Sequence, residues 1–155
     1  MVNIYTDGSS RGNPGHGGYG TILEYKGHIK EISEGFRLTT NNRMELLAVI
    51  IGLEALMREG LDVLVTSDSK YVVDAVEKSW VFNWEKKGFK KAKNPDLWKR
   101  FLVIYRKHKV RFKWVRGHND HPQNERCDEL AVNAALGKNL KVDFGYEAIV
   151  NGLPL

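Results

Sequence analysis

The sequence contains little cysteine and no long apolar run, and both absences narrow its class. A single cysteine, Cys127, excludes an intrachain disulfide and a cysteine-rich zinc site, and it suits a reducing compartment. No uninterrupted apolar stretch approaches the roughly 20 residues that a membrane-spanning helix needs, and the chain does not begin with a basic-then-apolar leader. We therefore expect a cytoplasmic protein that is neither exported nor inserted in a membrane.

Internal repeats, low-complexity tracts and linkers are also absent, so 155 residues with 42% hydrophobic content predict a single domain over residues 1–155. Acidic residues are fewer than basic ones: the sequence has 19 Asp and Glu and 24 Lys and Arg, which gives a net charge of +5. This balance favours polyanionic partners, although an ordinary basic protein shares it. The sequence shows neither an exposed apolar patch nor a partner helix, which argues against a purely structural or protein-binding role, and we expect a monomer.

Hydrophobic periodicity predicts an α/β fold in the order β-β-β-α-β-α-α-β-α. We predict strands at 2–6, 18–26, 29–37, 63–65 and 110–114, helices that begin near residues 42, 69 and 94, and a last helix that ends at Gly137. These elements form a mixed five-stranded sheet, with three antiparallel strands first and then parallel strands, and with helices on both faces. Residues 139–155 show no clear periodicity and are predicted to be a C-terminal extension with no role beyond packing or a tail.

Four acidic residues are predicted to meet at one edge of this sheet. Asp7 and Asp68 each follow the carboxyl end of a strand, where open α/β sheets gather their ligands. Glu45 and Asp128 lie in the first turns of two helices, close to the core. Taken singly, each acid has a structural explanation in a turn, a helix cap or a helix dipole. Together they repel one another unless a cation neutralises them, so the cluster predicts a hard divalent metal, for which Mg²⁺ fits best.

Glycine is concentrated directly after the first of these acids, with seven glycines between Gly8 and Gly27. A segment this poor in side chains is predicted to let a bulky polymer backbone approach the metal site, although ordinary turns account for some of the glycines. The combination favours a polymeric substrate.

Four segments carry the resemblance to a known family. The segments YTDGSSRGNPGHGGYG, TTNNRMEL, TSDSKYV and RGHNDHPQNERCDELA together resemble, in order and over nearly the whole chain, the signature segments of bacterial type 1 ribonuclease H. The resemblance implies a ribonuclease H-like fold and endonucleolytic hydrolysis of the RNA strand of RNA/DNA hybrids, which leaves 5′-phosphate and 3′-hydroxyl ends. It also implies that the four carboxylates bind two Mg²⁺ or Mn²⁺ ions and that His118 is catalytic. We expect one ion to activate water and the other to stabilise the departing 3′-oxygen.

The same resemblance implies a set of substrate contacts. Asn13, Asn41 and Asn42 match hybrid-contacting positions, and Thr40 and Arg43 match a pocket for a phosphate of the DNA strand. Short polar side chains suit the 2′-hydroxyls of a wide, shallow minor groove, although turn and helix-cap chemistry explains the same residues.

Two positions depart from the family pattern. Lys70 stands where family members commonly carry glutamine, so the minor-groove contact there is expected to differ. Ser10 stands where a cysteine is frequent, and this change is expected to be mild because a hydroxyl still forms hydrogen bonds.

The stretch WVFNWEKKGFKKAKNPDLW at residues 80–98 interleaves aromatic rings with lysines, which suits a grip on a nucleic-acid backbone. Its candidate substrate-binding residues are Trp80, Trp84, Lys86, Lys87, Lys90 and Lys91. A solvated basic helix with buried aromatics is the structural alternative. The stretch resembles the basic protrusion of the family but is shorter than its longest versions, between Phe89 and Asn94, so we expect weaker affinity for hybrids.

Several other functions fit parts of this pattern. A catalytically silent hybrid-binding module would keep the basic stretch but should lack at least one of the four acids, and none is missing. Another nuclease on the same fold, integrase-like or exonucleolytic, is an alternative because fold alone does not determine chemistry, but the basic stretch and the loop GHNDHPQNERCDE argue against it. A zinc site built from His118, His121 and Cys127 lacks a fourth ligand.

Overall fold

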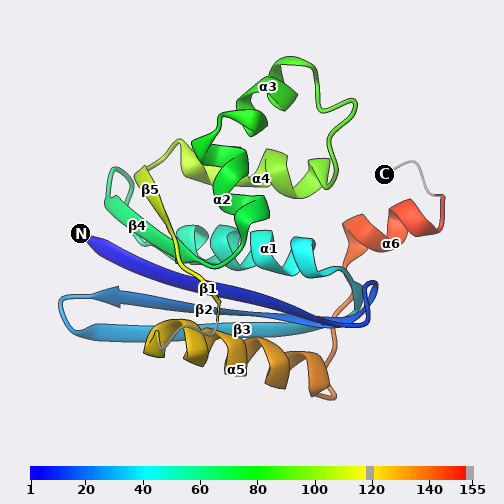
Figure 1. The fold of residues 1–155 in the computed structure, drawn as a ribbon, viewed down its shortest axis with the longest axis horizontal. Coiled ribbons are helices and arrows are strands. Elements are labelled where there is room, and N and C mark those ends of the chain that lie inside the picture. Colours follow the sequence, from blue (N-terminus) through cyan, green and yellow to red (C-terminus); the bar gives the residue numbers. More distant parts are fainter. Residues whose placement is uncertain (118–120, 153–155) are drawn as a thin grey trace.

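The described part of the chain contains a mixed sheet of five strands in the order β3-β2-β1-β4-β5 (Figure 1). The computed structural model describes residues 1–117 and 121–152. The strands are β1 (Val2–Arg11), β2 (Gly15–Tyr25), β3 (His28–Thr39), β4 (Asp62–Ser67) and β5 (Lys109–Trp114). Strands β1, β2 and β3 pair antiparallel, whereas β4 runs parallel to both β1 and β5. The predicted mixed sheet is therefore confirmed.

The helices are α1 (Asn41–Glu54), α2 (Lys70–Glu77), α3 (Trp80–Lys86), α4 (Pro95–Tyr105), α5 (Pro122–Leu136) and α6 (Phe144–Val150). The prediction missed α3 and α6, which have only seven residues each. Helices α1 and α5 lie on opposite sides of the sheet, and α3 projects away from it (Figure 1). Within the described residues, no helix has the length and apolar character needed to cross a membrane.

Helices α1 and α5 approach opposite faces of the sheet, and each packs against a glycine on its own face. A Cβ atom on Gly8 would lie 2.3 Å from the backbone nitrogen of Glu45 in α1, and one on Gly20 would lie 2.3 Å from the carbonyl oxygen of Cys127 in α5. Asp7 pairs with Gly20 across β1 and β2, and paired residues share a face of the sheet. Asp7 is thereby placed on the face that α5 covers, which brings it toward Asp128.

The glycines of β2 have a different use from the one we predicted. A Cβ atom on Gly18 in β2 would lie 2.4 Å from the carbonyl oxygen of Ala131 in α5, and one on its partner Gly35 in β3 would lie 2.1 Å from that of Ala134, also in α5. The space above Gly18 and Gly20 is filled by α5, so the prediction that the glycine-rich segment admits a polymer backbone is wrong for these two glycines. Their missing side chains instead allow α5 to lie close to the sheet and to present Asp128.

We expect Gly20→Ala to lower the free energy of unfolding by about 3 kcal/mol, because neither the strand nor the α5 backbone yields easily to the added methyl group. Urea unfolding measures this loss. Gly137→Ala is the matched control, since its Cβ would lie 3.3 Å from the nearest atom and its φ is −71°. Its cost should stay within about 0.5 kcal/mol, and equal losses for the two variants would contradict this account.

The segment after α5 is attached to the domain. The backbone N–H of Lys141 donates to the carbonyl of Gly35 at 2.8 Å, and the N–H of Arg37 donates to the carbonyl of Lys141 at 2.9 Å. The Arg37 guanidinium also donates to Glu147 in α6 at 2.7 and 2.9 Å. Lys141 and Glu147 therefore attach the segment after α5 to β3.

Candidate active site

The first three predicted carboxylates meet where β1, β4 and α1 come together. Thr6 and Ser67 form the last pair of the parallel β1–β4 ladder, so Asp7 and Asp68 are the next residues of two adjacent strands. Glu45 comes from the second turn of α1, one turn later than predicted, and α1 approaches β1 because Gly8 has no side chain. Oxygen atoms of the three carboxylates all lie within 4.8 Å of one another. The structural explanations of the single acids, as turn, cap or dipole residues, do not predict this convergence.

Asp128, the fourth predicted acid, is half-buried on α5 and lies on the same pocket. The described residues place it beside the group of three rather than within it. The pocket has a volume of about 440 Å³. Besides the four acids it is lined by Gly8, Ser9, Ser10, Asn41, Asn42, Ser69, Lys70 and Tyr71.

The electrostatics of the cluster are those of acids crowded in a partly buried site. Burial raises the pKa of Asp7 to about 8; a hydrogen bond with Glu45 opposes this shift, and the charges of Asp68 and Asp128 add to it. Burial and the neighbouring Asp7 raise the pKa of Glu45 well above its usual value. The Gly8 N–H donates to Asp7 Oδ1 at 2.9 Å and also to Glu45 Oε1. Burial and mutual repulsion therefore raise the pKa of both carboxyls when no cation is bound.

The donor set fits a hard divalent cation. One carboxylate oxygen, Asp68 Oδ1, is buried and has no hydrogen-bond partner among the described residues. A buried oxygen without a partner is costly, and a cation bound by it would supply the missing interaction and neutralise the crowded charge. In the described ranges, Asp7, Glu45 and Asp68 form the only group of three side chains suited to metal binding.

The residues of the alternative zinc site have structural roles where the structure describes them. His118 lies outside the described residues, so its catalytic role stays a prediction. His121 caps α5, because its Nδ1 accepts from the backbone N–H of Asn124 at 3.3 Å. Cys127 is buried at the contact of α5 with β2, and burial raises the pKa of its thiol. The zinc alternative thus gains no support.

The predicted hybrid contacts gather at the start of α1. Asn41 and Asn42 are exposed and line the pocket of the acids. Asn13 lies beside them, because its Oδ1 accepts from the backbone N–H of Asn41 at 3.0 Å. Thr40 is the N-cap of α1, and its Oγ1 accepts from the backbone N–H of Arg43 at 3.3 Å. The structural alternative is correct for Thr40, and the contacts of these residues with substrate stay predictions.

Arg43 differs from its expected role. Its side chain is only 1% exposed, and its guanidinium makes five hydrogen bonds, to Asp96, Asp143 and Asn94. A guanidinium has five N–H donors, so this geometry offers none of them to a phosphate. Nothing near Arg43 in the sequence pointed to this arrangement, because Asp96 and Asp143 lie 53 and 100 residues further along the chain.

The basic stretch combines its two predicted readings. Lys86, Lys87, Lys90 and Lys91 are exposed. Trp84 packs against the buried Trp98 with ring centroids 5.8 Å apart, so Trp84 belongs to the packing beneath the lysines. Trp80 is 43% exposed, and Lys78 Nζ lies 5.3 Å from its ring centroid. The lysines and Trp80 therefore remain available for a nucleic acid, whereas Trp84 is mainly structural.

Lys70 is held at the edge of the acidic pocket. Its Nζ lies 4.8 Å from the ring centroid of Trp114, and Trp114 Nε1 donates to the backbone carbonyl of Asp68 at 3.1 Å. This arrangement places a positive charge at the edge of the acidic pocket, and the contact of Lys70 with substrate stays a prediction.

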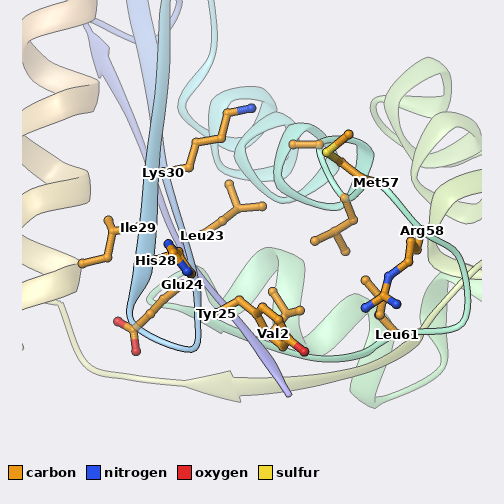
Figure 2. Close-up of a pocket in the computed structure, with 12 residues that line it drawn as sticks. Val2, Leu23, Glu24, Tyr25, His28, Ile29, Lys30, Met57, Arg58 and Leu61 are labelled. Atoms are coloured by element: carbon orange, nitrogen blue, oxygen red, sulfur yellow. The ribbon is translucent and has the colours of Figure 1, made fainter.

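A second hollow lies at the other end of the sheet and is apolar in character (Figure 2). It is formed by the start of β1, the β2–β3 hairpin and the segment that follows α1. Its lining includes Val2, Leu23, Ile29, Met57 and Leu61, and none of the predicted site residues. The acidic pocket is therefore the one that unites the predicted chemistry.

Comparison with known proteins settles the family. The RNase H family model matches residues 1–136. A ribonuclease H of Desulforamulus reducens is 54% identical over 147 residues, which is 92% of each chain. The chain belongs to the RNase H family. A ribonuclease H of Shewanella denitrificans is likewise 54% identical over 152 residues, covering 95% of this chain and 94% of that one. The resemblance drawn from the four sequence segments is confirmed.

Solved RNase H structures share the fold. LC9-RNase H1, described as a type 1 RNase H with the type 2 active-site motif, superimposes with a TM-score of 0.79 at 33% identity, over 95% of this chain and 80% of that one. LC11-RNase H1, solved in complex with an RNA/DNA hybrid, gives a TM-score of 0.63 at 29% identity, over 87% of this chain and 96% of that one. These likenesses confirm the predicted RNase H-like fold.

Proposed function

We propose that this chain is an endoribonuclease that hydrolyses the RNA strand of RNA/DNA hybrids and leaves 5′-phosphate and 3′-hydroxyl ends. The observation that carries this proposal is the convergence of Asp7, Glu45 and Asp68, whose carboxylate oxygens lie within 4.8 Å of one another. Membership of the RNase H family and the hybrid bound by LC11-RNase H1 support the choice of substrate. We further propose that the chain acts as a monomeric, single-domain protein in the cytoplasm.

The four carboxylates are proposed to hold two divalent ions, Mg²⁺ or Mn²⁺. Such ions, when bound, supply Lewis-acid activation of water and stabilise the charge on the departing oxygen. Asp7 and Glu45 would hold such ions as carboxylates, and the Gly8 N–H would keep both side chains oriented. Asp128 closes the site from α5. His118 is proposed to assist proton transfer or product release.

Substrate selection is proposed to rest on two surfaces. Asn13, Asn41 and Asn42 lie at the rim of the acidic pocket, where amide groups suit the 2′-hydroxyls of the RNA strand. The exposed lysines of residues 86–91, together with Trp80 and Lys70, are positioned to contact phosphates of the duplex. The asparagines then discriminate RNA from DNA, and the lysines contribute affinity that salt weakens.

A cleavage assay with four nucleic acids tests the function. We expect cleavage of the labelled RNA strand of an RNA/DNA hybrid in Mg²⁺ or Mn²⁺, and none of single-stranded RNA, duplex RNA or duplex DNA. A chelator should stop the reaction, because the crowded carboxylates need a cation to act. The products should carry 5′-phosphate and 3′-hydroxyl ends. Tight hybrid binding without cleavage in either metal would contradict the proposed enzymatic function and would support a hybrid-binding module instead.

A further inference from the structure

The N-terminal turn of α1 is attached on both sides to one buried carboxylate from the C-terminal segment. Asp143 caps α6, since its Oδ1 accepts from the backbone N–H of Tyr146 at 3.3 Å. Its Oδ2 accepts from Thr39 Oγ1 at 2.6 Å, just before the turn. The same carboxylate accepts from Arg43 Nε at 2.7 Å and from a second Arg43 nitrogen at 2.8 Å, just after the turn.

The residues between these two attachments are the proposed substrate contacts. Thr40, Asn41 and Asn42 span the gap from Thr39 to Arg43, and both asparagines line the acidic pocket. Thr39 and Arg43 are buried, with exposed fractions of 0% and 1%. We call residues 40–42 the recognition turn. Its two ends are therefore fixed by the buried side chains of Thr39 and Arg43, which the substrate does not reach.

The attachment continues toward the other side of the pocket. Arg43 donates to Asp96 at 2.7 and 2.9 Å and to Asn94 Oδ1 at 3.3 Å, which joins it to the start of α4. Asn94 Nδ2 donates to the hydroxyl of Tyr71 at 2.9 Å, and Tyr71 lines the acidic pocket. One hydrogen-bonded network thus connects α6, the recognition turn and the pocket wall.

Helix α6 is packed too closely against Arg43 to shift relative to it. Gly145 lies directly over the ion pair, because a Cβ atom there would be 2.0 Å from Asp96 Oδ2 and 2.8 Å from the second terminal nitrogen of Arg43. The bidentate contact of a guanidinium with a carboxylate fixes orientation as well as distance. The geometry of the turn accordingly depends on where α6 is docked.

We infer that Asp143 is a positioning residue for substrate binding, and that the C-terminal segment 139–152 sets the geometry of the recognition turn at residues 40–42. This inference rests on the proposed function, because it assigns those residues to the hybrid. Asp143 itself does not touch the substrate. It keeps Asn41 and Asn42 in the arrangement that binds the RNA strand, which lowers the ordering that binding must impose.

The decisive variant is Asp143→Asn, which keeps the shape of the side chain but places an amide N–H₂ where Arg43 or Thr39 now donates. We expect the hybrid Kd, measured by fluorescence anisotropy in chelator, and the KM in Mg²⁺ each to rise about tenfold. The kcat should stay within about twofold, because the carboxylate cluster is not altered. Thr39→Val removes a single hydrogen bond and should raise Kd and KM about threefold in the same direction.

The matched control is Arg37→Ala, which breaks the other side-chain link to α6 without touching Asp143. Arg37 pairs with Glu147 on the surface and is 58% exposed. Its Kd and KM should stay within about twofold of the parent values, because an exposed ion pair adds little rigidity. All assays are run below the unfolding temperature of every variant, and if Asp143→Asn does not fold, Thr39→Val decides the question.

Two results would overturn the inference. Unchanged Kd and KM in the Asn and Val variants, with lower stability, would assign Asp143 to the fold alone. A lower kcat with unchanged Kd would assign it to the chemistry through Glu45. Because Kd is measured in chelator, it does not depend on hydrolysis, so a parent protein that binds hybrids but cuts none would overturn the proposed function and not this inference.

Discussion

Asp7→Asn is expected to abolish hydrolysis of hybrid RNA and at the same time to stabilise the protein in the absence of metal. The activity should fall by about a thousandfold, the scale on which loss of one preorganised electrostatic group lowers kcat. The stability should rise because burial, together with the charges of Asp68 and Asp128, raises the pKa of Asp7 to about 8. The same substitution should therefore lower the catalytic activity and raise the free energy of unfolding.

The sign of the stability effect follows from proton binding. In the unfolded chain an aspartate titrates near pH 3.9, whereas in the folded protein Asp7 titrates at about 8. Between these values the folded state binds the proton more tightly, so the stability of the parent protein falls as the pH rises through this window. Asparagine does not ionise. At pH 8 in chelator we expect the variant to be more stable by about 2 kcal/mol, and at pH 4 the difference should nearly vanish.

Urea unfolding of both proteins in chelator at a series of pH values measures this difference, and the cleavage assay measures the activity. Addition of Mg²⁺ should stabilise the parent protein more than the variant, because a ligand that binds only the folded state raises its stability. Asp62→Asn is the control, since Asp62 is exposed at the start of β4. If Asp7→Asn is less stable than the parent protein at every pH, the account of the crowded carboxylates is wrong.

Arg43→Met should be the most destabilising substitution outside the hydrophobic core. Methionine has a similar length but leaves the buried carboxylate of Asp143, which is 8% exposed, without its cation. Removal of one partner of a buried ion pair costs about 4 kcal/mol, because the remaining charge is desolvated and uncompensated. Urea unfolding at pH 7 measures the loss.

The pH dependence gives this prediction a second readout. Burial opposes ionisation of Asp96, but its contacts with Arg43 prevail and hold the pKa of that carboxyl below its usual value. The ion pair therefore stabilises the parent protein above about pH 4, and this contribution is lost as the pH falls through the lowered pKa. The difference between parent and variant should accordingly shrink in acid.

Arg100→Met provides the matched control. Arg100 also makes a bidentate contact, with Glu54 at 2.6 and 2.8 Å, but both side chains are partly exposed. Its loss should cost less than about 1 kcal/mol, as for other exposed ion pairs. Equal losses for the two arginine variants would show that burial of the Arg43 network contributes nothing.

The short helices show where local pattern ceases to be informative. Helix α3 begins at Trp80, and its N-cap residue Ser79 has a positive φ and makes no side-chain capping bond, so the serine does not act as the usual helix cap. Helix α6 is capped by Asp143, but the same carboxylate is occupied by Arg43, 100 residues away in sequence. Seven residues are too few for a helical period to stand out, and such helices form because tertiary contacts hold them. The full length of β1 has the same origin, since its glycine-flanked end is a strand only through pairing with β2.

The sequence by itself determined the sheet, its long helices and the identity of the carboxylates. Asp7 and Asp68 follow the last pair of the parallel β1–β4 ladder, and the four acids line one pocket as predicted from the sheet edge. Glu45 and Asp128 lie in the second turns of α1 and α5, one turn later than predicted. Only the tertiary structure decided that Gly18 and Gly20 admit a helix, and that Arg43 is buried between acids from α4 and α6. Those roles depend on which side chain comes to lie opposite another after folding, and partners 50 to 100 residues apart leave no periodic trace in the chain.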